Sequence, residues 1–226
     1  MQMNKIVESQ IRIYKTNFLE NGDSPEGTFN QNSAIQNLRF ERLLGSFDLN
    51  EYNPFSIHDI GCGICDIYGF LTNRNYQFVY SGTDIILEMK ELADNKYPEI
   101  QYYVRDILQG EILDKYDFLV LSGTFNLPGQ TDFNDWRIFT REIISKMFFM
   151  ANFAISFNFL SKNADYFRKD MYYEDPTEVL NYCLQNLSRF VFIDHSYALH
   201  EFTVTVFKKD FMKSKTSDVE FNRFFK

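Results

Sequence analysis

Short apolar runs rich in β-branched and aromatic residues alternate with helical patterns from residue 56 onward. Such runs, bounded by polar and turn-forming residues, predict buried strands. We expect strands at residues 56–60, 78–82, 101–104, 117–121, 152–157, 190–194 and 202–207. The first five alternate with helices, which predicts a mainly parallel seven-stranded sheet covered on both faces. The last two, separated only by residues 196–201, should form an antiparallel hairpin at its edge.

Two later helices have patterns of their own. Five large residues recur at spacings of three and four and predict one apolar stripe: Phe133, Trp136, Phe139, Ile143 and Met147. Further on, Asp175 precedes Pro176 and Glu178 follows, a helix start with proline at the first helical position. The buried face of this second helix is expected to carry Leu180, Cys183, Leu184 and Leu187.

The first 45 residues differ from the rest and predict an N-terminal helical cap. A loop near residues 21–32 separates helices near 6–19 and 34–44, with Ile35, Leu38 and Leu43 placed to cover the core. A chain of 226 residues is long enough for one full core. We therefore predict one domain, with the cap at 1–45, the core at 46–210 and a C-terminal tail at 211–226 that ends in solvent.

The charge balance bears on partners. A formal net charge of −8 and a pI near 5.0 disfavour nucleic acid and anionic lipid. The most apolar window, 143–160, contains Lys146, Asn152 and Asn158 and does not predict a membrane span. The start has no secretory pattern, and three cysteines suit a reducing compartment, so we expect a cytoplasmic protein with a small-molecule partner. The pattern does not indicate an oligomeric state.

A glycine-rich segment joins the first strand to the next helix. It contains Asp59, Gly61 and Gly63, and the glycines allow a tight turn and close approach of the backbone to a ligand. Ligands in such sheets bind outside the carboxyl ends of the strands. Asp66 stands where a dinucleotide fold needs a third glycine, and no Gly-Lys-Ser or Gly-Lys-Thr follows. Nicotinamide and phosphate-loop binding are therefore disfavoured.

The run Asp59-Ile60-Gly61-Cys62-Gly63 resembles the Asp-x-Gly-x-Gly signature of class I S-adenosylmethionine-dependent methyltransferases of the small-molecule type. The resemblance covers about residues 56–207. It implies a Rossmann-like three-layer α/β sandwich, S-adenosylmethionine as cofactor and S-adenosylhomocysteine as product. It also implies that Asp59 helps to hold the amino group of the methionine part. Cys65 departs from the small residue that the family often has there.

Two further acids follow the next two strands. A carboxylate at Asp84 can accept both ribose hydroxyl protons. The resemblance implies that Asp106 bonds the adenine amino group, although an aspartate after a strand can also simply cap a helix. Arg39 could pair with the methionine carboxylate or lie on the surface. The expected cofactor contacts are Arg39, Asp59, Gly61, Cys62, Gly63, Asp84, Ile85, Asp106, Ile107 and Ser122.

Cys62 and Cys65 form a C-x-x-C spacing, which raises the alternatives of zinc binding or redox chemistry. Zinc needs about four ligands, and only Cys183 and three scattered histidines remain. We predict no metal site.

Methyl transfer is an in-line displacement, for which a base is optional. We expect substrate contacts from Asn126, after the fourth strand, and Asn158, at the end of the fifth. Residues 165–173 are either a lid, with Tyr166, Tyr172 and Tyr173 as contacts, or an ordinary connection. His200, beside Glu201 and with Tyr197, is the candidate base, the alternative being surface residues of an edge hairpin.

The expected activity is methylation of an oxygen or nitrogen atom of a small polar metabolite. A sugar- or nucleotide-linked intermediate of surface polysaccharide synthesis is one candidate acceptor. The alternatives are a protein methyltransferase and a non-catalytic protein that binds the cofactor or acts as a scaffold.

Overall fold

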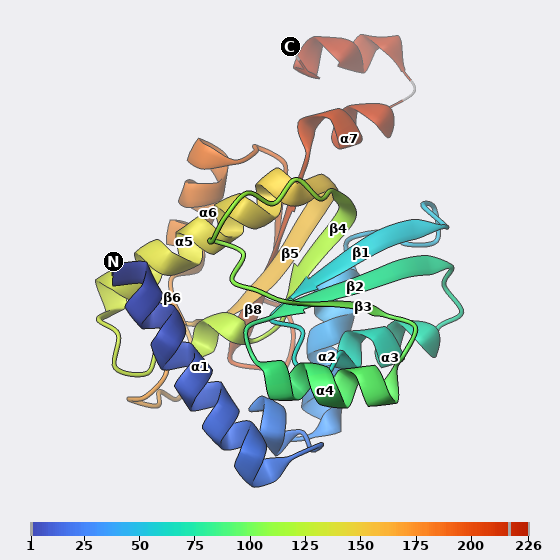
Figure 1. Ribbon diagram of the computed structural model, residues 1–226. Helices are drawn as coiled ribbons and strands as arrows, with labels where there is room; N and C mark the ends of the chain where they lie inside the picture. Colours follow the sequence, from blue (N-terminus) through green and yellow to red (C-terminus); the bar gives the residue numbers. More distant parts are fainter. Residues whose placement is uncertain (1, 217, 226) are drawn as a thin grey trace.

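The computed structural model describes residues 2–216 and 218–225, which form a twisted sheet between two layers of helices (Figure 1). The strands are β1 (Phe55–Ile60), β2 (Phe78–Asp84), β3 (Gln101–Val104), β4 (Tyr116–Leu121), β5 (Ala151–Ser161), β6 (Tyr173–Glu174), β7 (Val191–Asp194) and β8 (Glu201–Phe207). The helices are α1 (Gln2–Asn21), α2 (Ser33–Leu44), α3 (Asp66–Thr72), α4 (Leu87–Lys96), α5 (Phe133–Met150), α6 (Pro176–Asn186) and α7 (Lys209–Ser214). Short 3₁₀ turns are η1 (Glu26–Thr28), η2 (Thr124–Asn126) and η3 (Val219–Phe225).

The sheet has the strand order β3-β2-β1-β4-β5-β8-β7. Strands β1 to β5 pair in parallel, whereas β8 runs antiparallel to both β5 and β7. The mainly parallel sheet and its C-terminal hairpin are thus confirmed. Sequence reasoning missed β6, which pairs with the end of β5 through two residues and is too short to give an apolar run.

Apolar side chains alternate between the two faces of the sheet. In β4, Leu119 and Leu121 pack on the face covered by α5 and α6. Phe118 and Val120 pack on the other face, with side chains of α2, α3 and α7. A parallel strand buried on both faces needs apolar residues at every position, which is why its sequence reads as a continuous run.

Helix α5 has the predicted apolar stripe, except that Phe133, the first residue assigned to the stripe, is not buried. Trp136, Phe139, Ile143 and Met147 are buried, whereas Phe133 is 51% exposed. Phe133 is the first helical residue, where its ring meets Tyr172 edge-on instead of entering the core. The periodicity therefore predicts the face correctly but not the point where burial begins.

Helix α6 begins as predicted, with the Asp175 side chain accepting a hydrogen bond from the Thr177 backbone amide. Its buried face is narrower than expected. Val179 and Cys183 are buried, but Leu184 is 45% exposed, so the prediction for Leu184 was wrong. The helix lies against β7 at the sheet edge, where one stripe is enough to cover the strand.

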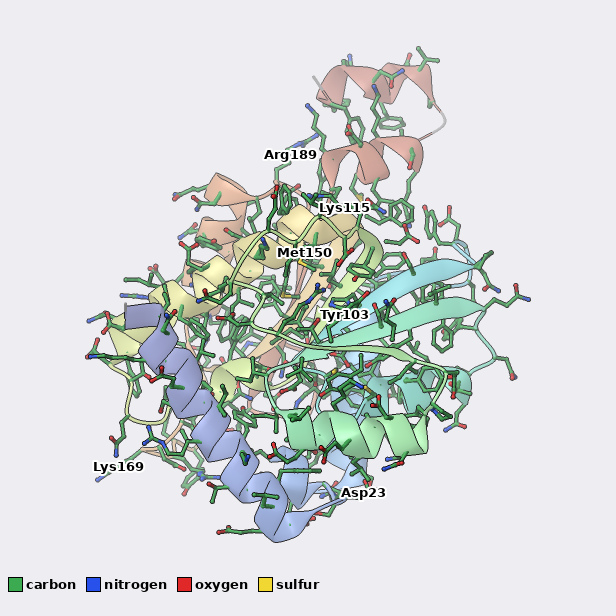
Figure 2. The ribbon with its side chains drawn as sticks, viewed as in Figure 1. Asp23, Tyr103, Lys115, Met150, Lys169 and Arg189 are labelled. Carbon is green, nitrogen blue, oxygen red and sulfur yellow. The ribbon has the colours of Figure 1, made fainter. Side chains whose placement is uncertain are left out.

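The first and last helices of the chain lie at opposite ends of the parallel strands. Helix α1 crosses the carboxyl-end side, whereas α7 follows β8 at the amino-end side (Figure 1). Phe211, inside the predicted tail, is buried and stacks on Phe153, so the core continues through α7. Beyond it, η3 returns to the domain at Arg189, labelled in Figure 2, whose guanidinium donates to the Phe224 carbonyl oxygen.

Within the described residues, no helix is long and apolar enough to cross a membrane.

Candidate functional site

The glycine loop after β1 turns through left-handed backbone. Gly61 has φ of 68° and Gly63 has φ of 54°, values that favour glycine. A Cβ at Gly61 would lie 2.4 Å from the Thr124 hydroxyl, so the close approach of the η2 turn also requires glycine. Cys65 adopts φ of 64° before α3 begins, where the related signature often has a small residue. The loop thus presents bare backbone at the carboxyl end of β1.

Asp59, near the end of β1, is buried and only partly satisfied. Its Oδ2 accepts a hydrogen bond of 2.9 Å from the Tyr80 hydroxyl. Its Oδ1 is buried and has no hydrogen-bond partner within the described residues. Burial raises the pKa of this carboxyl to about 8, against the lowering effect of Tyr80. An acceptor left in this state fits a cationic N–H donor of a ligand.

Asp84 ends β2 and organises the neighbouring loops. Its Oδ1 accepts from the backbone amides of Ile85 at 2.7 Å and Ile86 at 3.0 Å, and its Oδ2 accepts from the Gly63 amide at 2.9 Å. Burial raises the pKa of Asp84, and these amides oppose the shift. A carboxylate has about four lone-pair positions and three are taken here, so one position remains for a hydroxyl donor.

Two adjoining cavities share Tyr14, Gly61, Asp84 and Thr124. The smaller has a volume of about 100 Å³ and a largely apolar wall. Its wall includes Ile85, Asp106, Ile107, Trp136, Phe139 and Ile143. Asp106 Oδ1 accepts from the Leu108 amide at 2.9 Å, which fixes the carboxylate at the end of β3. Five of the predicted cofactor residues, counting the shared Gly61 and Asp84, thus meet at this cavity.

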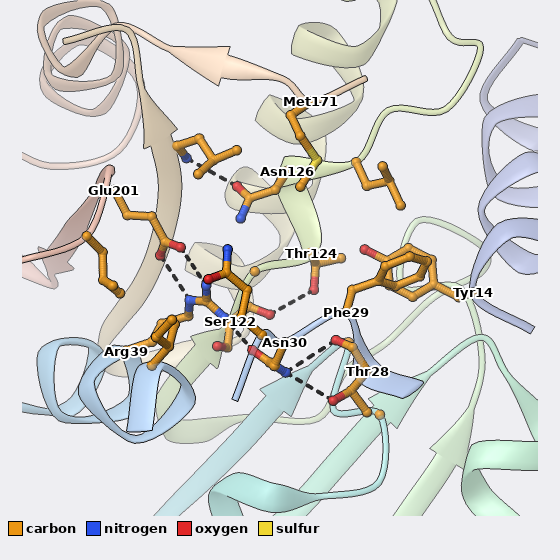
Figure 3. Close-up of a pocket in the computed structure, with 18 of the residues that line it drawn as sticks. Tyr14, Thr28, Phe29, Asn30, Arg39, Ser122, Thr124, Asn126, Met171 and Glu201 are labelled. Carbon is orange, nitrogen blue, oxygen red and sulfur yellow. Dashed lines mark hydrogen bonds and ion pairs between the residues drawn. The ribbon is translucent and has the colours of Figure 1, made fainter. Parts of the chain in front are cut away.

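The larger cavity has a volume of about 370 Å³ and is drawn in Figure 3. The predicted residues on its wall are Arg39, Gly61, Gly63, Asp84, Ser122, Asn126 and His200. A small recess of about 50 Å³ beside it is lined by Asp59, Cys62 and Ser122, among others. All ten predicted cofactor residues therefore lie on these three spaces.

A buried ion pair forms part of the larger cavity's wall (Figure 3). Arg39 binds Glu201 through two hydrogen bonds, Nε to Oε2 at 2.9 Å and Nη2 to Oε1 at 2.5 Å. Its Nη1 donates to Asn30 at 2.6 Å. Asn158 donates to Glu201 Oε2 at 2.6 Å. The Arg39 guanidinium is therefore already paired inside the protein, instead of being free for a cofactor carboxylate.

The sequence matches no family model. It is 30% identical over 162 residues to Putative methyltransferase Rv1506c of Mycobacterium tuberculosis, a match that spans 71% of this chain and 97% of that protein. This chain belongs to the methyltransferase family of that protein.

Solved structures share the fold of this methyltransferase. Magnesium protoporphyrin IX methyltransferase (ChlM) of Synechocystis PCC 6803, solved with bound SAH, superposes with a TM-score of 0.63 at 12% identity. That match covers 92% of this chain and all of the other. The N-methyltransferase NodS of Bradyrhizobium japonicum WM9, in complex with S-adenosyl-l-homocysteine, gives 0.59 at 12% identity, covering 88% and 98% of the two chains. At these identities the likeness supports the fold alone.

The acceptor side of the methyltransferase only partly follows the prediction. Asn126 is buried on the larger cavity, and its Oδ1 accepts from the Leu160 amide at 3.2 Å. Asn158 is fully buried behind that wall, where its Oδ1 accepts from the Gly123 amide and its amide donates to Glu201. Asn158 therefore supports the site without lining either cavity.

The predicted lid tyrosines point elsewhere. Tyr166 is 65% exposed, the Tyr172 hydroxyl donates to buried Glu174, and the Tyr173 hydroxyl accepts from the Arg168 amide. None of the three lines either described cavity. Arg168 and Met171 of the same segment do line the larger one. The sequence thus pointed to a segment that does reach the cavity, but it did not predict which residues of the segment line the wall.

The two candidate bases are also separated. His200 lines the larger cavity, and its carbonyl oxygen accepts from the Ser161 amide, which ties the β7–β8 loop to the end of β5. Tyr197 lies off the wall, with its hydroxyl 2.9 Å from Thr203 Oγ1, and burial raises its pKa. A half-buried phenol with a raised pKa, already hydrogen-bonded to Thr203, is poorly placed to accept a proton.

The C-x-x-C pair is part of the packing. Cys62 and Cys65 are buried and free, and burial raises the pKa of the Cys62 thiol. The Cys62 sulfur lies 2.6 Å from where a Cβ at Gly82 would stand, so it fills the space beside β2. Within residues 2–216 and 218–225, no group of three or more metal-ligating side chains is placed to hold a metal ion.

Sequence reasoning missed the contribution of α1. Val7, Gln10 and Tyr14 line the smaller cavity, and Tyr14 reaches the larger one as well. Their spacing of three and four residues places them on one helix face. The spacing can be seen in the sequence, but the sequence does not show that this face of α1 covers the cavity.

Proposed function

We propose that this protein binds S-adenosylmethionine in the adjoining cavities and methylates an oxygen or nitrogen atom of a small polar metabolite. The observation that carries the proposal is the placement of Asp59, Asp84 and Asp106 on one set of connected spaces, at the ends of three successive strands. In this proposal the unpartnered Asp59 Oδ1 accepts from the methionine amino group. Asp84 accepts from a ribose hydroxyl, and Asp106 with its apolar neighbours holds the adenine.

The cofactor supplies an electrophilic methyl group on a sulfonium, which the acceptor takes by in-line displacement. The main contribution of the protein to such a reaction is alignment of the acceptor atom. The Asn126 amide can hold the acceptor, because its Oδ1 is engaged by the Leu160 amide and its Nδ2 remains available as a donor. His200, on the same wall, takes the proton of a hydroxyl or ammonium acceptor.

The size of the larger cavity supports a small acceptor. Its volume of about 370 Å³ falls in the range of small-molecule sites, and the cofactor shares part of it. Asn30, Gln31 and Asn126 are polar groups on a wall that also includes Phe29 and Met171, which suits a polar metabolite with an apolar part. A sugar- or nucleotide-linked intermediate of surface polysaccharide synthesis is one acceptor of this kind.

Isothermal titration with S-adenosylhomocysteine tests the cofactor site. The wild type should bind with micromolar affinity, and Asp84→Ala should weaken binding by about a hundredfold or more, because charged hydrogen bonds are lost from a buried site. Asp94→Ala, an exposed aspartate on α4, is the matched control and should bind like the wild type. Thermal unfolding shows whether Asp84→Ala still folds. A folded wild type that does not bind would overturn the proposal.

The acceptor class needs a separate experiment. Purified protein is incubated with methyl-labelled S-adenosylmethionine and a cell lysate, and the products are separated by size. We expect label in the small-molecule fraction, and nucleotide-linked sugars belong in the first panel of pure acceptors. Label found only in protein would favour the protein methyltransferase alternative. Binding of S-adenosylhomocysteine without transfer to any fraction would favour a non-catalytic role.

A further inference from the structure

The cap helix α1 brings a buried amide to the smaller cavity. Gln10 is 4% exposed and lies on the wall with Val7 and Tyr14. Its Nε2 donates to the Leu127 carbonyl oxygen at 3.1 Å, which fixes the orientation of the amide. The remaining atom, Oε1, is buried and has no hydrogen-bond partner in the described part of the chain. A buried acceptor without a partner is unfavourable, so a donor from a ligand is expected there.

A second polar atom on the same cavity is also without a partner. Arg105 donates through Nε to the Thr83 hydroxyl at 3.3 Å and through Nη1 to Asp114 at 3.3 Å. The guanidinium lies over the Tyr103 ring, 4.2 Å from its centre, and its Nη2 is buried without a hydrogen-bond partner within residues 2–216 and 218–225. Gln10 and Arg105, which both line the smaller cavity, thus carry one acceptor and one donor without a hydrogen-bond partner.

The position of Gln10 indicates that it would contact the base of the cofactor and not the ribose. Tyr14 and Asp84 line both cavities, and Asp84 is the ribose anchor of the proposed function. Gln10, one helical turn before Tyr14, lines only the smaller cavity, together with Trp136 and Phe139. A flat aromatic base suits that apolar end. A base bound there would have Gln10 and Arg105 among its neighbours.

We propose that Gln10 Oε1 accepts one of the two hydrogens of the exocyclic amino group of adenine, the other remaining for Asp106, and that Arg105 Nη2 donates to a ring nitrogen. The inference rests on the proposed function and extends it by making α1 a determinant of base specificity. Adenine presents an amino donor beside a ring acceptor, which complements this pair. Hypoxanthine presents a carbonyl acceptor in place of the amino donor, so it would leave Gln10 Oε1 unpaired and facing another acceptor.

The test compares S-adenosylhomocysteine with S-inosylhomocysteine, whose base is hypoxanthine. Binding of each is measured by titration or by displacement of labelled S-adenosylhomocysteine, in the wild type and in Gln10→Met, which keeps the side-chain length. The wild type should prefer adenine by about a hundredfold or more. Gln10→Met should bind S-adenosylhomocysteine about tenfold more weakly, and its preference for adenine should fall by about the same factor.

The ratio of the two affinities separates recognition from a structural role. Loss of the bond to Leu127 could loosen α1, but that would weaken both ligands equally and leave the ratio unchanged. An unchanged ratio in a folded Gln10→Met therefore overturns the inference, and it does so even if S-adenosylhomocysteine still binds. Failure of the wild type to bind S-adenosylhomocysteine overturns the proposed function instead.

Two further variants complete the design. Gln185→Met replaces an exposed glutamine on α6, away from the described cavities, and should keep the wild-type preference for adenine. If Gln10→Met does not fold, Arg105→Lys tests the other half of the pair, because a single ammonium cannot reproduce the guanidinium fork. It should lower the preference for adenine severalfold. An unchanged preference in Arg105→Lys would then count against the inference.

Discussion

The loops at the ends of β1 and β2 form the proposed cofactor side, and the wall around Arg39 and Glu201 forms the proposed acceptor side. The two sides differ in how they are built. On the cofactor side, main-chain amides hold the key carboxylate: three of them, from Gly63, Ile85 and Ile86, donate to Asp84. On the acceptor side, side chains far apart in sequence hold each other, as Arg39 and Glu201 do across 162 residues. The cofactor side therefore depends on loop geometry, and the acceptor side on the tertiary fold.

This difference explains what can be varied on each side. Short loops at adjacent strand ends keep their geometry through backbone bonds, which tolerate changes in the surrounding side chains. A wall made of side chains from α2, β5 and β8 can be rebuilt by single substitutions, which suits a surface that must match one acceptor. Substitutions on the cofactor side should therefore change the affinity for the cofactor. Substitutions on the acceptor side should change the stability of the protein or its use of the acceptor.

The largest expected effect comes from breaking the buried ion pair. Glu201→Ala leaves the Arg39 guanidinium buried without its counter-charge and should lower the free energy of unfolding by about 3–5 kcal/mol. Denaturant unfolding measures this. Asp94→Ala breaks the exposed pair with Lys90 and should change stability by less than about 1 kcal/mol. Equal effects of the two substitutions would show that the acceptor side does not depend on its long-range contacts.

His200 separates binding from catalysis. His200→Ala should lower kcat about a hundredfold or more for a hydroxyl or ammonium acceptor, because the proton loses its acceptor group. Its affinity for S-adenosylhomocysteine should remain within about twofold of the wild type, because the residue belongs to the acceptor side. His195→Ala, in the same loop but away from the cavity wall, is the matched control. A large loss of cofactor affinity in His200→Ala would contradict the division into two sides.

Asp59 should make cofactor affinity depend on pH. Burial, together with nearby Asp84 and Asp66, raises the pKa of Asp59 to about 8, so the carboxyl is protonated at lower pH. A bound amino cation favours the carboxylate, and binding therefore releases a proton and tightens as pH rises towards 8. The association constant for S-adenosylhomocysteine should rise about tenfold between pH 6 and 7 and level off above pH 8.

The control for this pH effect is a ligand without the amino group. 5′-Methylthioadenosine lacks the methionine amino and carboxyl groups and should bind with little dependence on pH in this range. Asp59→Asn should remove the dependence for S-adenosylhomocysteine as well. The same pH slope for both ligands, or a slope that persists in Asp59→Asn, would show that another group is titrating.

The sequence predicted the sheet and the common location of the three strand-end acids better than it predicted which residues line the larger cavity, for physical reasons. Strands buried on both faces give continuous apolar runs, and an acid after each strand must lie at the common carboxyl edge. Asn158 shows the limit on the other side. Phe157 and Phe159 point to the α5 face of the sheet, so Asn158 between them points to the opposite face. There its side-chain amide donates a hydrogen bond to Glu201. Which face bears the cavity depends on tertiary packing that no local pattern contains.

Substitutions in residues 165–173 should have the smallest effects. They test which residues of this segment contact the acceptor. Met171 lines the larger cavity, so Met171→Ala should raise the KM for the acceptor about threefold and leave kcat nearly unchanged. Tyr166 is 65% exposed and off the wall, so Tyr166→Ala should change neither constant by more than about twofold. Steady-state kinetics with the acceptor from the screen measures both. If Tyr166→Ala had the larger effect, the segment would have to close over the acceptor as a lid, since only movement could bring that ring to the cavity.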